Sequence, residues 1–468
     1  MTDLSVLDRR PLPGEPRRYD FPDFDRSGLP NGLTVIRAHV PGRPLLQAQL
    51  MVRGDAGGGA TSEMTSRAGA TVLAARAMSE GTQRRDAVEF VEASERLGAE
   101  LGAAAGWDSL SVHVEVPRAR LDAAMALLSE MALQPSFPER EVDRLRDERL
   151  NDLQQAMADP RRRVDRAFPD VIYADGAPYA RPLAGSEETV ADLDRDALVA
   201  RHGELMRPGA STLIVSGDLE GVPLDDIMAA AFGTWPAGAD EGPLADGGPD
   251  RPAAGRRVLL VDRPGAPQSE IRVGHVGTRR LVDDFHALSV MNALLGGLFN
   301  SRLNRLLREE RGYTYGVHSY FDMRRAAGPF SVRCAVESEV TAPAIVDIMS
   351  ELERVREAPV ETDELDAARD YLVGVFPLRF ETSAQVAGAL AGLVTYGLAD
   401  DELDRYRPTI AAVSAEAVLA AANEHIDPEA ASIVVVGDVS KFEEPLAEAG
   451  YGAIEVVHDE GFGADAQT

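Results

Sequence analysis

The sequence predicts an α+β protein built from two homologous domains, each an antiparallel sheet with helices packed against it. The first observation is length, because 468 residues exceed what a single hydrophobic core usually organises. The second is an internal repeat, in which strand-like and helix-like segments recur in the same order in both halves. The third is that order itself: strands and helices do not alternate strictly, which favours antiparallel sheets over a parallel βαβ array.

A segment without apolar periodicity divides the chain into halves of similar size. Residues 236–256 (PAGADEGPLADGGPDRPAAGR) are rich in Pro, Gly, Ala and Asp, which is typical of a linker. We therefore expect five parts, in this order: an N-terminal extension (1–24), an N-terminal domain (25–235), the linker (236–256), a C-terminal domain (257–455) and an acidic tail (456–468).

The repeat is seen most clearly in two pairs of strand-like segments. Residues 210–219 (ASTLIVSGDL) and 431–439 (ASIVVVGDV) are β-branched runs stopped by Gly-Asp, which predicts a buried strand followed by a turn. Residues 111–116 (SVHVEV) and 331–336 (SVRCAV) recur at the same separation, and an amphipathic helix is predicted after each. A third pair, EREVDRLRDERL and TDELDAARDYLV, repeats in the same order. Three echoes in one order indicate a duplicated domain.

Charge and cysteine content exclude several classes of partner. The formal net charge is −29, which opposes binding to nucleic acid and to acidic membrane surfaces and attracts basic peptides. Cys334 is the only cysteine, so an internal disulfide is impossible and a reducing compartment is the natural environment. With no signal-peptide pattern and no apolar run of spanning length, we expect a soluble, cytoplasmic protein.

The motifs of a self-contained catalytic centre are missing from the sequence. No two of the eight histidines lie three to five residues apart, so no helix offers the paired imidazoles of a zinc hydrolase. A single cysteine excludes thiolate clusters, and there is no GxSxG and no phosphate-binding glycine loop. An independent enzyme of unrelated chemistry therefore finds no support here.

Residues 299–321 (FNSRLNRLLREERGYTYGVHSYF) predict a helix, a turn and a strand. Asn300 or Ser301 can cap the helix, and Gly312 can end it in a left-handed conformation. Arg308 falls in the last helical turn and Tyr315 early in the strand, so the turn could bring a guanidinium and a phenol into the same space. Arg offers a donor fork to a peptide carbonyl, and Tyr a hydroxyl that can bond an oxyanion. The alternative is a surface arginine beside a core tyrosine.

Residues 69–82 (GATVLAARAMSEGT) predict an apolar helix whose one face carries Val72 and Arg76, four residues apart, where a pair of metal ligands would fit. This segment resembles, without a gap, the G-L-A-H-F-L-E-H-M-L-F-x-G-T stretch of the insulinase and mitochondrial-processing-peptidase family of zinc peptidases. Residues 31–35 (NGLTV), residues 178–190 (PYARPLAGSEETV) and the duplication fit the same family.

The resemblance implies a family member without its metal site. Val72 stands at the first zinc-binding histidine, Ala75 at the catalytic glutamate and Arg76 at the second histidine. The third ligand, a glutamate, would fall near Asp152, and Asp152 is expected to pair with Arg76 instead of binding metal. The resemblance also implies a LuxS/metallohydrolase-like fold with two domains in a clamshell arrangement, and no metal in this chain.

The family's second element is an arginine and a tyrosine seven residues apart, which Arg308 and Tyr315 match, with Thr314 before the tyrosine. In split bacterial members, one subunit resembles a zinc carrier and its partner a carrier of the Arg/Tyr pair. The chain is therefore expected to be active only in a heterodimer with a homologous zinc-bearing subunit, acting on extended peptides or leader peptides. The alternative is a structural or peptide-holding subunit with no part in catalysis.

Overall fold

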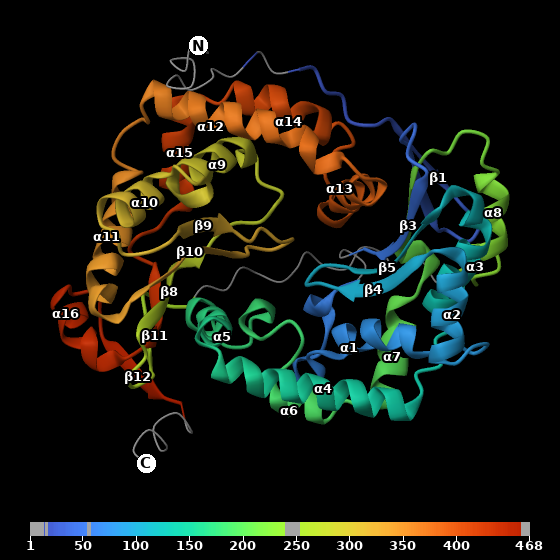
Figure 1. The fold of residues 1–468 in the computed structure, drawn as a ribbon, viewed down its shortest axis with the longest axis horizontal. Helices are drawn as coiled ribbons and strands as arrows, with labels where there is room; N and C mark the ends of the chain where they lie inside the picture. Colours follow the sequence, from blue (N-terminus) through green and yellow to red (C-terminus); the bar gives the residue numbers. More distant parts are fainter. Residues whose placement is uncertain (1–13, 15–16, 54–57, 239–252, 460–468) are drawn as a thin grey trace, which may run out of the picture.

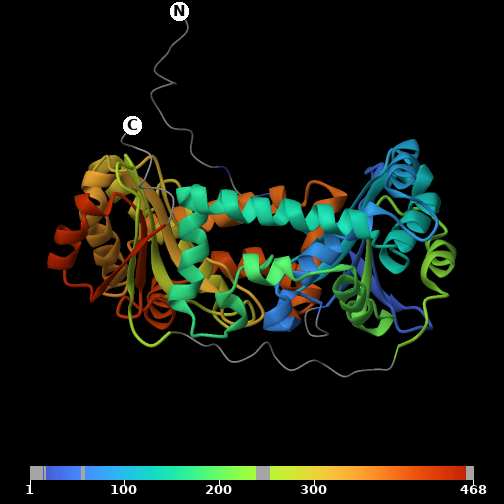
Figure 2. The same cartoon turned by 90° about the horizontal axis from the view of Figure 1, so that it is seen from below.

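Two six-stranded sheets, each with its own helices, lie at opposite ends of the long axis of the computed structural model (Figure 1). The structure describes residues 14, 17–53, 58–238 and 253–459. Most of the expected linker (239–252), of the N-terminal extension (1–13 and 15–16) and of the acidic tail (460–468) lies outside these residues. In Figure 2 the long helix α4 (Glu139–Ala158) extends from one half toward the other.

The first sheet has the strand order β1-β2-β6-β3-β5-β4. Its strands are β1 (Phe24–Gly28), β2 (Thr34–His39), β3 (Leu45–Val52), β4 (Glu100–Ala105), β5 (Leu110–Pro117) and β6 (Ser211–Gly217). The helices of this half are α1 (Ala70–Ala77), α2 (Ala87–Leu97), α3 (Leu121–Leu133), α4, α5 (Pro160–Ile172), α6 (Glu187–Ala191), α7 (Arg195–Leu205) and α8 (Leu224–Phe232).

The second sheet has the order β12-β7-β11-β8-β10-β9. Its strands are β7 (Val258–Asp262), β8 (Gln268–Val276), β9 (Val317–Phe321), β10 (Pro329–Glu337), β11 (Ser432–Gly437) and β12 (Ile454–His458). The helices are α9 (Phe285–Asn292), α10 (Arg302–Asn304), α11 (Thr341–Arg354), α12 (Thr362–Val375), α13 (Ser383–Tyr396), α14 (Glu402–Ala411), α15 (Ala415–His425) and α16 (Glu443–Glu448). Strand β12 crosses the expected boundary at residue 455.

The two sheets share one topology, as the sequence repeat predicts. Strands β2-β6-β3-β5-β4 of the first sheet correspond in order to β7-β11-β8-β10-β9 of the second. The Gly-Asp ends also have a common cause, because a Cβ on Gly217 would lie 2.3 Å from Leu46 Cδ2, and one on Gly437 would lie 2.4 Å from Ser269 Oγ. Only glycine permits that approach of the neighbouring strand.

The sheets are mixed, not purely antiparallel as the sequence suggested. Most strand pairs are antiparallel, but β2 runs parallel to β6, and β7 runs parallel to both β11 and β12. The physical reason is the long connection between the first and last strands of each repeat. A chain that passes through a whole domain of helices can return in the same direction, which a tight hairpin cannot do.

Each half lends one helix to the sheet of the other half. Helix α5 packs on β8 and β11 of the second sheet, and α13 packs on β3 and β6 of the first. The side chains of Phe168, Val171 and Ile172 on α5 are at most 3% exposed, and burying each contributes roughly 1.5–3 kcal/mol. Strands β6 and β11 are consequently buried on both faces, which explains their continuous β-branched sequences.

No helix in the described part of the chain combines the length and apolar character needed to cross a bilayer.

Candidate functional site

Helix α1 carries the positions at which the family resemblance places zinc ligands. Val72 is half-buried, Ala75 is buried, and Arg76 is exposed one turn after Val72. An aliphatic side chain, a methyl group and a cationic guanidinium offer no lone pair to a metal ion. Within the residues that the structure describes, no group of three or more His, Cys, Asp or Glu side chains is placed to hold a metal. These residues do not fit zinc.

Arg76 is paired with Glu148 on α4, where its Nη2 lies 3.0 Å from Glu148 Oε2. The expected pair between Arg76 and Asp152 is therefore wrong. Asp152 lies one turn further along α4 and binds Arg149 at 2.5 Å and Arg162 at 2.6 Å. The prediction was wrong by one helical turn of α4. The place where α1 crosses α4 sets Glu148 opposite Arg76, and a single sequence does not reveal where two helices cross.

A network of arginine and glutamate side chains lies between α1 and α4, where the family resemblance places the metal. Arg144 binds Glu148 at 2.5 Å and also Glu80 at 2.8 Å. The hydrogen bond from Arg144, more than the one from Arg76, holds the pKa of the Glu148 carboxyl below its usual value. The carboxylate thus stays ionised and is shared by two guanidinium groups, whose positive charges would repel a divalent cation.

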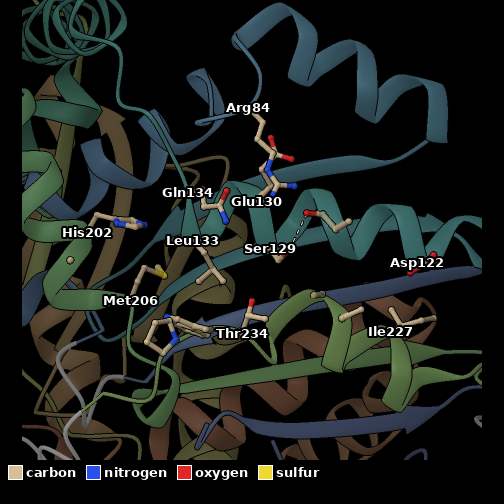
Figure 3. A pocket seen from close by; sticks show the side chains of 16 residues that line it. Arg84, Asp122, Ser129, Glu130, Leu133, Gln134, His202, Met206, Ile227 and Thr234 are labelled. Atoms are coloured by element: carbon tan, nitrogen blue, oxygen red, sulfur yellow. Dashed lines mark hydrogen bonds between the residues drawn. The ribbon is translucent and has the colours of Figure 1, made fainter. Parts of the chain in front are cut away.

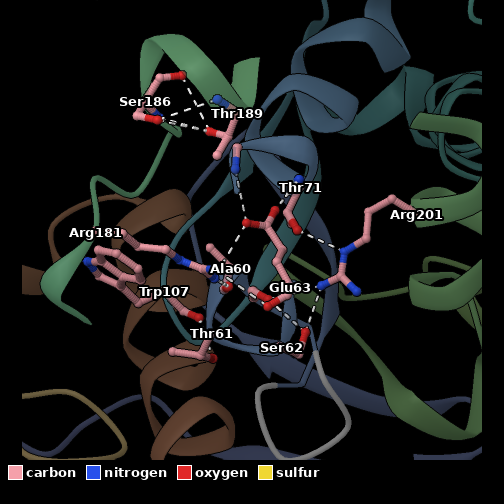
Figure 4. Close-up of polar contacts among 12 residues, drawn as sticks. Ala60, Thr61, Ser62, Glu63, Thr71, Trp107, Arg181, Ser186, Thr189 and Arg201 are labelled. Carbon is pink, nitrogen blue, oxygen red and sulfur yellow. Dashed lines mark hydrogen bonds and ion pairs between the residues drawn. The ribbon is translucent and has the colours of Figure 1, made fainter. Parts of the chain in front are cut away.

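A buried polar network holds the start of α1 in place (Figure 4). The Glu63 carboxylate, whose side chain is 1% exposed, accepts hydrogen bonds from the backbone N–H groups of Gly69 and Thr71 at the first turn of α1. Arg201 on α7 donates to Thr71 Oγ1 at 2.9 Å and to Ser62 Oγ at 2.7 Å. An anion at a helix N-terminus is favourable, so α1 keeps its position without a metal ligand to secure it.

Arg308 and Tyr315 flank a turn whose backbone is secured on both sides. Ser301 occupies the N-cap position, although its side chain makes no capping hydrogen bond, and Gly312 is left-handed as expected, with φ of 67°. The helix continues beyond α10 as a π-helical turn, Arg305–Glu310, and the strand begins at Val317, later than the sequence suggested. The buried Asn304 side chain binds both the N–H and the C=O of Val317, at 3.1 and 2.8 Å. The loop is thereby attached to the helix.

The two side chains differ in environment. The Arg308 guanidinium carbon lies 4.1 Å from the centre of the Phe299 ring, while Tyr315 is 94% exposed. Thr314 next to it is tied to Ala335 O through its hydroxyl at 2.8 Å. In the described residues no hydrogen bond or ring contact joins Arg308 to Tyr315. A tyrosine displayed to solvent from an anchored loop is available to an outside group.

Sequence reasoning missed a buried polar contact between the halves. The β4–β5 turn supplies Trp107 and Asp108, which meet the equivalent β9–β10 turn of the second sheet. Asp108 accepts hydrogen bonds from the Tyr179 hydroxyl at 3.1 Å and from the Arg325 N–H at 3.0 Å. Burial is the main cause that raises the pKa of the Asp108 carboxyl, and the Arg325 N–H opposes it. The only signal in the sequence was an acid beside a tryptophan at a strand turn.

Replacing Asp108 by Ala should destabilise the protein. Because Asp108 is 7% exposed, the change leaves the Tyr179 hydroxyl and the Arg325 N–H without an acceptor, and each unsatisfied buried donor costs about 1–3 kcal/mol. The midpoint of denaturant unfolding should fall accordingly. Tyr179→Phe removes this hydroxyl, which also accepts a long hydrogen bond from the Ala326 N–H at 3.4 Å, but keeps the Arg325 N–H paired with Asp108. It is the matched control and should cost less. Equal midpoints for the wild type and Asp108→Ala would show that this contact contributes nothing.

A pocket of about 470 Å³ lies elsewhere, between α3, α7 and α8 (Figure 3). His202 lines it, its Nε2 donating to Ala132 O at 2.8 Å, and burial lowers the pKa of this histidine. Glu130 at the same wall is occupied by Thr82 and Arg85. None of the residues singled out in the sequence lines this pocket.

Two family models match successive stretches of the chain. The model of Insulinase (Peptidase family M16) matches residues 49–187, which contain α1 and α4. The model of the Peptidase M16 inactive domain matches residues 192–372, which contain Arg308 and Tyr315. The chain belongs to the insulinase family of peptidases. The family resemblance seen in the sequence is thus confirmed.

Some relatives of this insulinase-family chain are named as zinc proteases and others as non-peptidase homologues. An uncharacterized zinc protease of Mycobacterium tuberculosis is 26% identical over 359 residues, covering 77% of this chain and 81% of that protein. The non-peptidase homolog YmxG of Helicobacter pylori is 24% identical over 328 residues, covering 70% and 74%. A peptidase M16 inactive domain from Pseudomonas fluorescens shares the fold, with a TM-score of 0.81 at 23% identity over 89% of this chain and 98% of that one. Without metal donors at Val72, Ala75 and Arg76, this family member is catalytically incomplete by itself.

Proposed function

We propose that the chain is the non-zinc subunit of a two-chain peptidase, assembled with a homologous subunit that carries H-x-x-E-H. One observation carries the proposal: the metal positions on α1 are filled by Val72, Ala75 and Arg76, whereas Tyr315 is displayed to solvent from a secured loop. The chain has therefore lost the side chains that would bind the metal, but it keeps an exposed hydroxyl that can donate a hydrogen bond to a substrate. The partner would supply the metal-dependent attack on the peptide bond.

In this scheme each residue of the pair has a separate task. The Tyr315 hydroxyl donates a hydrogen bond to the oxyanion that forms at the scissile carbonyl. The Arg308 guanidinium, steadied over the Phe299 ring, donates to a neighbouring carbonyl of the substrate and holds the peptide in register.

The substrate is expected to be an extended peptide or an unstructured leader that adds a strand to a sheet edge. Strands β4 and β9 are the terminal strands of their sheets, and both point toward the centre of the molecule in Figure 1. On β9 the Asn304 side chain already binds the N–H and C=O of Val317, so β4 is the edge that a peptide would extend. Unpaired backbone groups on a terminal strand bind an extended peptide through main-chain hydrogen bonds. We also propose a cytoplasmic location, which the single, buried Cys334 supports.

The test is assembly and turnover. The purified chain alone should not cleave a quenched-fluorescence peptide library, a zinc-bearing homologue alone should cleave it weakly, and the mixture should form a stable complex with much higher activity. Comigration on gel filtration reports assembly independently of turnover. Absence of both a complex and any gain in activity would refute the proposal.

A second candidate is a structural or peptide-holding subunit with no part in catalysis. The observation that favours it is that Arg308 and Tyr315 do not converge on one another. In that case the chain would still bind its partner or a peptide, but substitutions at Arg308 and Tyr315 would leave turnover unchanged.

A further inference from the structure

A row of side chains crosses the whole second sheet on the face opposite its main core. Residues directly opposite each other in neighbouring strands share a face of the sheet. The strand register places the following residues in one row from β12 to β9: Glu455, Leu259, Val434, Arg272, Arg333 and His318. The row therefore changes from apolar to cationic toward the β9 edge.

Helix α5 covers the apolar part of the row. Leu259 and Val434 are buried in one cluster with Phe168 and Val171 of α5. Arg272 comes next and is fully occupied, with Asp165 of α5 at 2.8 Å and Glu270 at 3.1 Å. Arg333 and His318 lie beyond it, on β10 and on the terminal strand β9.

Arg333 is held in position but only partly neutralised. Its guanidinium carbon lies 4.1 Å from the centre of the Tyr320 ring, and its Nε donates to Ser331 Oγ at 3.2 Å. The acid next to it, Asp165, is 3.7 Å away and lies closer to Arg272. The side chain is nevertheless only 35% exposed. Arg333 thus shares its nearby carboxylate with Arg272, and a second carboxylate would form a stronger, charge-assisted hydrogen bond with it.

The charges around Arg333 also indicate that its positive charge is only partly compensated. Burial lowers the pKa of Arg333 to about 10, Asp165 opposes that change, and the positive charges of Arg272 and Arg161 add to it. Although the whole chain has a net charge of −29, Arg272 and Arg333 lie side by side here and share Asp165. Such a place attracts an anionic group from outside.

We propose that Arg333, with Tyr320 beneath it and His318 beside it, binds a carboxylate of the peptide substrate. The carboxylate is either an acidic side chain or the free C-terminus, both of which match the planar donor fork of arginine. The inference rests on the proposed function, since it needs a peptide substrate held within reach of the β9 and β10 side chains. It adds a preference for substrates with a carboxylate at one fixed distance from the residue held by Arg308 and Tyr315.

Three fluorescent peptides of one sequence test the proposal by anisotropy with the full-length chain. The first is neutral with an amidated C-terminus, the second carries a scanned Glu, and the third has a free C-terminal carboxylate. The wild-type chain should bind the second or the third at least about tenfold more tightly than the first. Which of the two gains affinity identifies the source of the carboxylate.

Arg333→Gln should abolish that preference and leave binding of the neutral peptide unchanged. Arg333→Lys should restore part of it, since the charge returns without the fork, and Tyr320→Leu should weaken it through loss of the supporting ring. Arg118→Gln is the matched control: that side chain is 38% exposed and paired with Asp218 at 3.4 Å in the other half. It should change nothing.

Equal binding of the three peptides by the wild-type chain would overturn the subsite. So would a preference that survives Arg333→Gln, or an equal loss for the neutral peptide. The two proposals fail separately: unchanged turnover after substitution of Arg308 and Tyr315 removes the catalytic role, whereas an unchanged carboxylate preference in Arg333→Gln removes only the subsite.

Discussion

Tyr315→Phe and Arg308→Ala are each expected to lower kcat of the assembled pair by roughly 10²–10³, which is the typical cost of removing one donor from an oxyanion-type site. Tyr315→Phe deletes a single hydroxyl from a side chain that is 94% exposed, so no buried partner is left unsatisfied and the fold should be unaffected. Arg308→Ala also removes the guanidinium from the Phe299 ring, and it should raise KM as well.

Matched controls separate chemistry from surface effects. Arg305 belongs to the same π-helical turn as Arg308, and its side chain is 61% exposed. Tyr371 on α12 is an exposed tyrosine elsewhere, at 53%. Arg305→Ala and Tyr371→Phe should retain full turnover, and all four variants should comigrate with the partner on gel filtration. If Tyr315→Phe and Arg308→Ala turn over substrate as fast as these controls, the holding role of the second candidate is the correct one.

The triple variant Val72→His, Arg76→His and Arg144→Ala is expected to gain a zinc site at α1. Histidines four residues apart on α1 present two imidazoles on one face, and removing both Arg76 and Arg144 frees Glu148 to act as the third ligand. Isothermal titration, or competition with a chromogenic chelator, should show stoichiometric zinc binding, with no binding to the wild-type chain under the same conditions.

The zinc prediction can be tested further by asking which carboxylate of α4, Glu148 or Asp152, acts as the third ligand. Adding Glu148→Ala to the triple variant should weaken zinc binding by at least about 100-fold, since a ligand contributes more than the roughly 10–100-fold of an outer-shell partner. Adding Asp152→Ala should change little, because Asp152 is engaged by Arg149 and Arg162. The reverse ranking would mean that α4 presents Asp152, not Glu148, to the helix.

Local patterns in the sequence were sufficient for the elements and for the loss of the metal site. The two β-branched runs that end in Gly-Asp form strands β6 and β11, as predicted. The sequence repeat corresponds to a strand order that the two sheets share. Val72, Ala75 and Arg76 lack metal donors whatever surrounds them, so that conclusion needed no coordinates. The N-cap position of Ser301 and the left-handed Gly312 after the helix depend on neighbours in the chain and were predicted for the same reason.

Features that depend on contacts between segments far apart in the chain could be seen only in the tertiary structure. The partner of Arg76 is Glu148 and not Asp152, because the crossing of two helices selects one turn of α4. The exchange of α5 and α13 between the sheets, the Asp108 contact between the halves, and the cationic end of the row at Arg333 all join segments that lie far apart in the chain. Helix propensity, strand pattern and donor chemistry are properties of nearby residues, whereas packing depends on which surfaces meet when the whole chain folds.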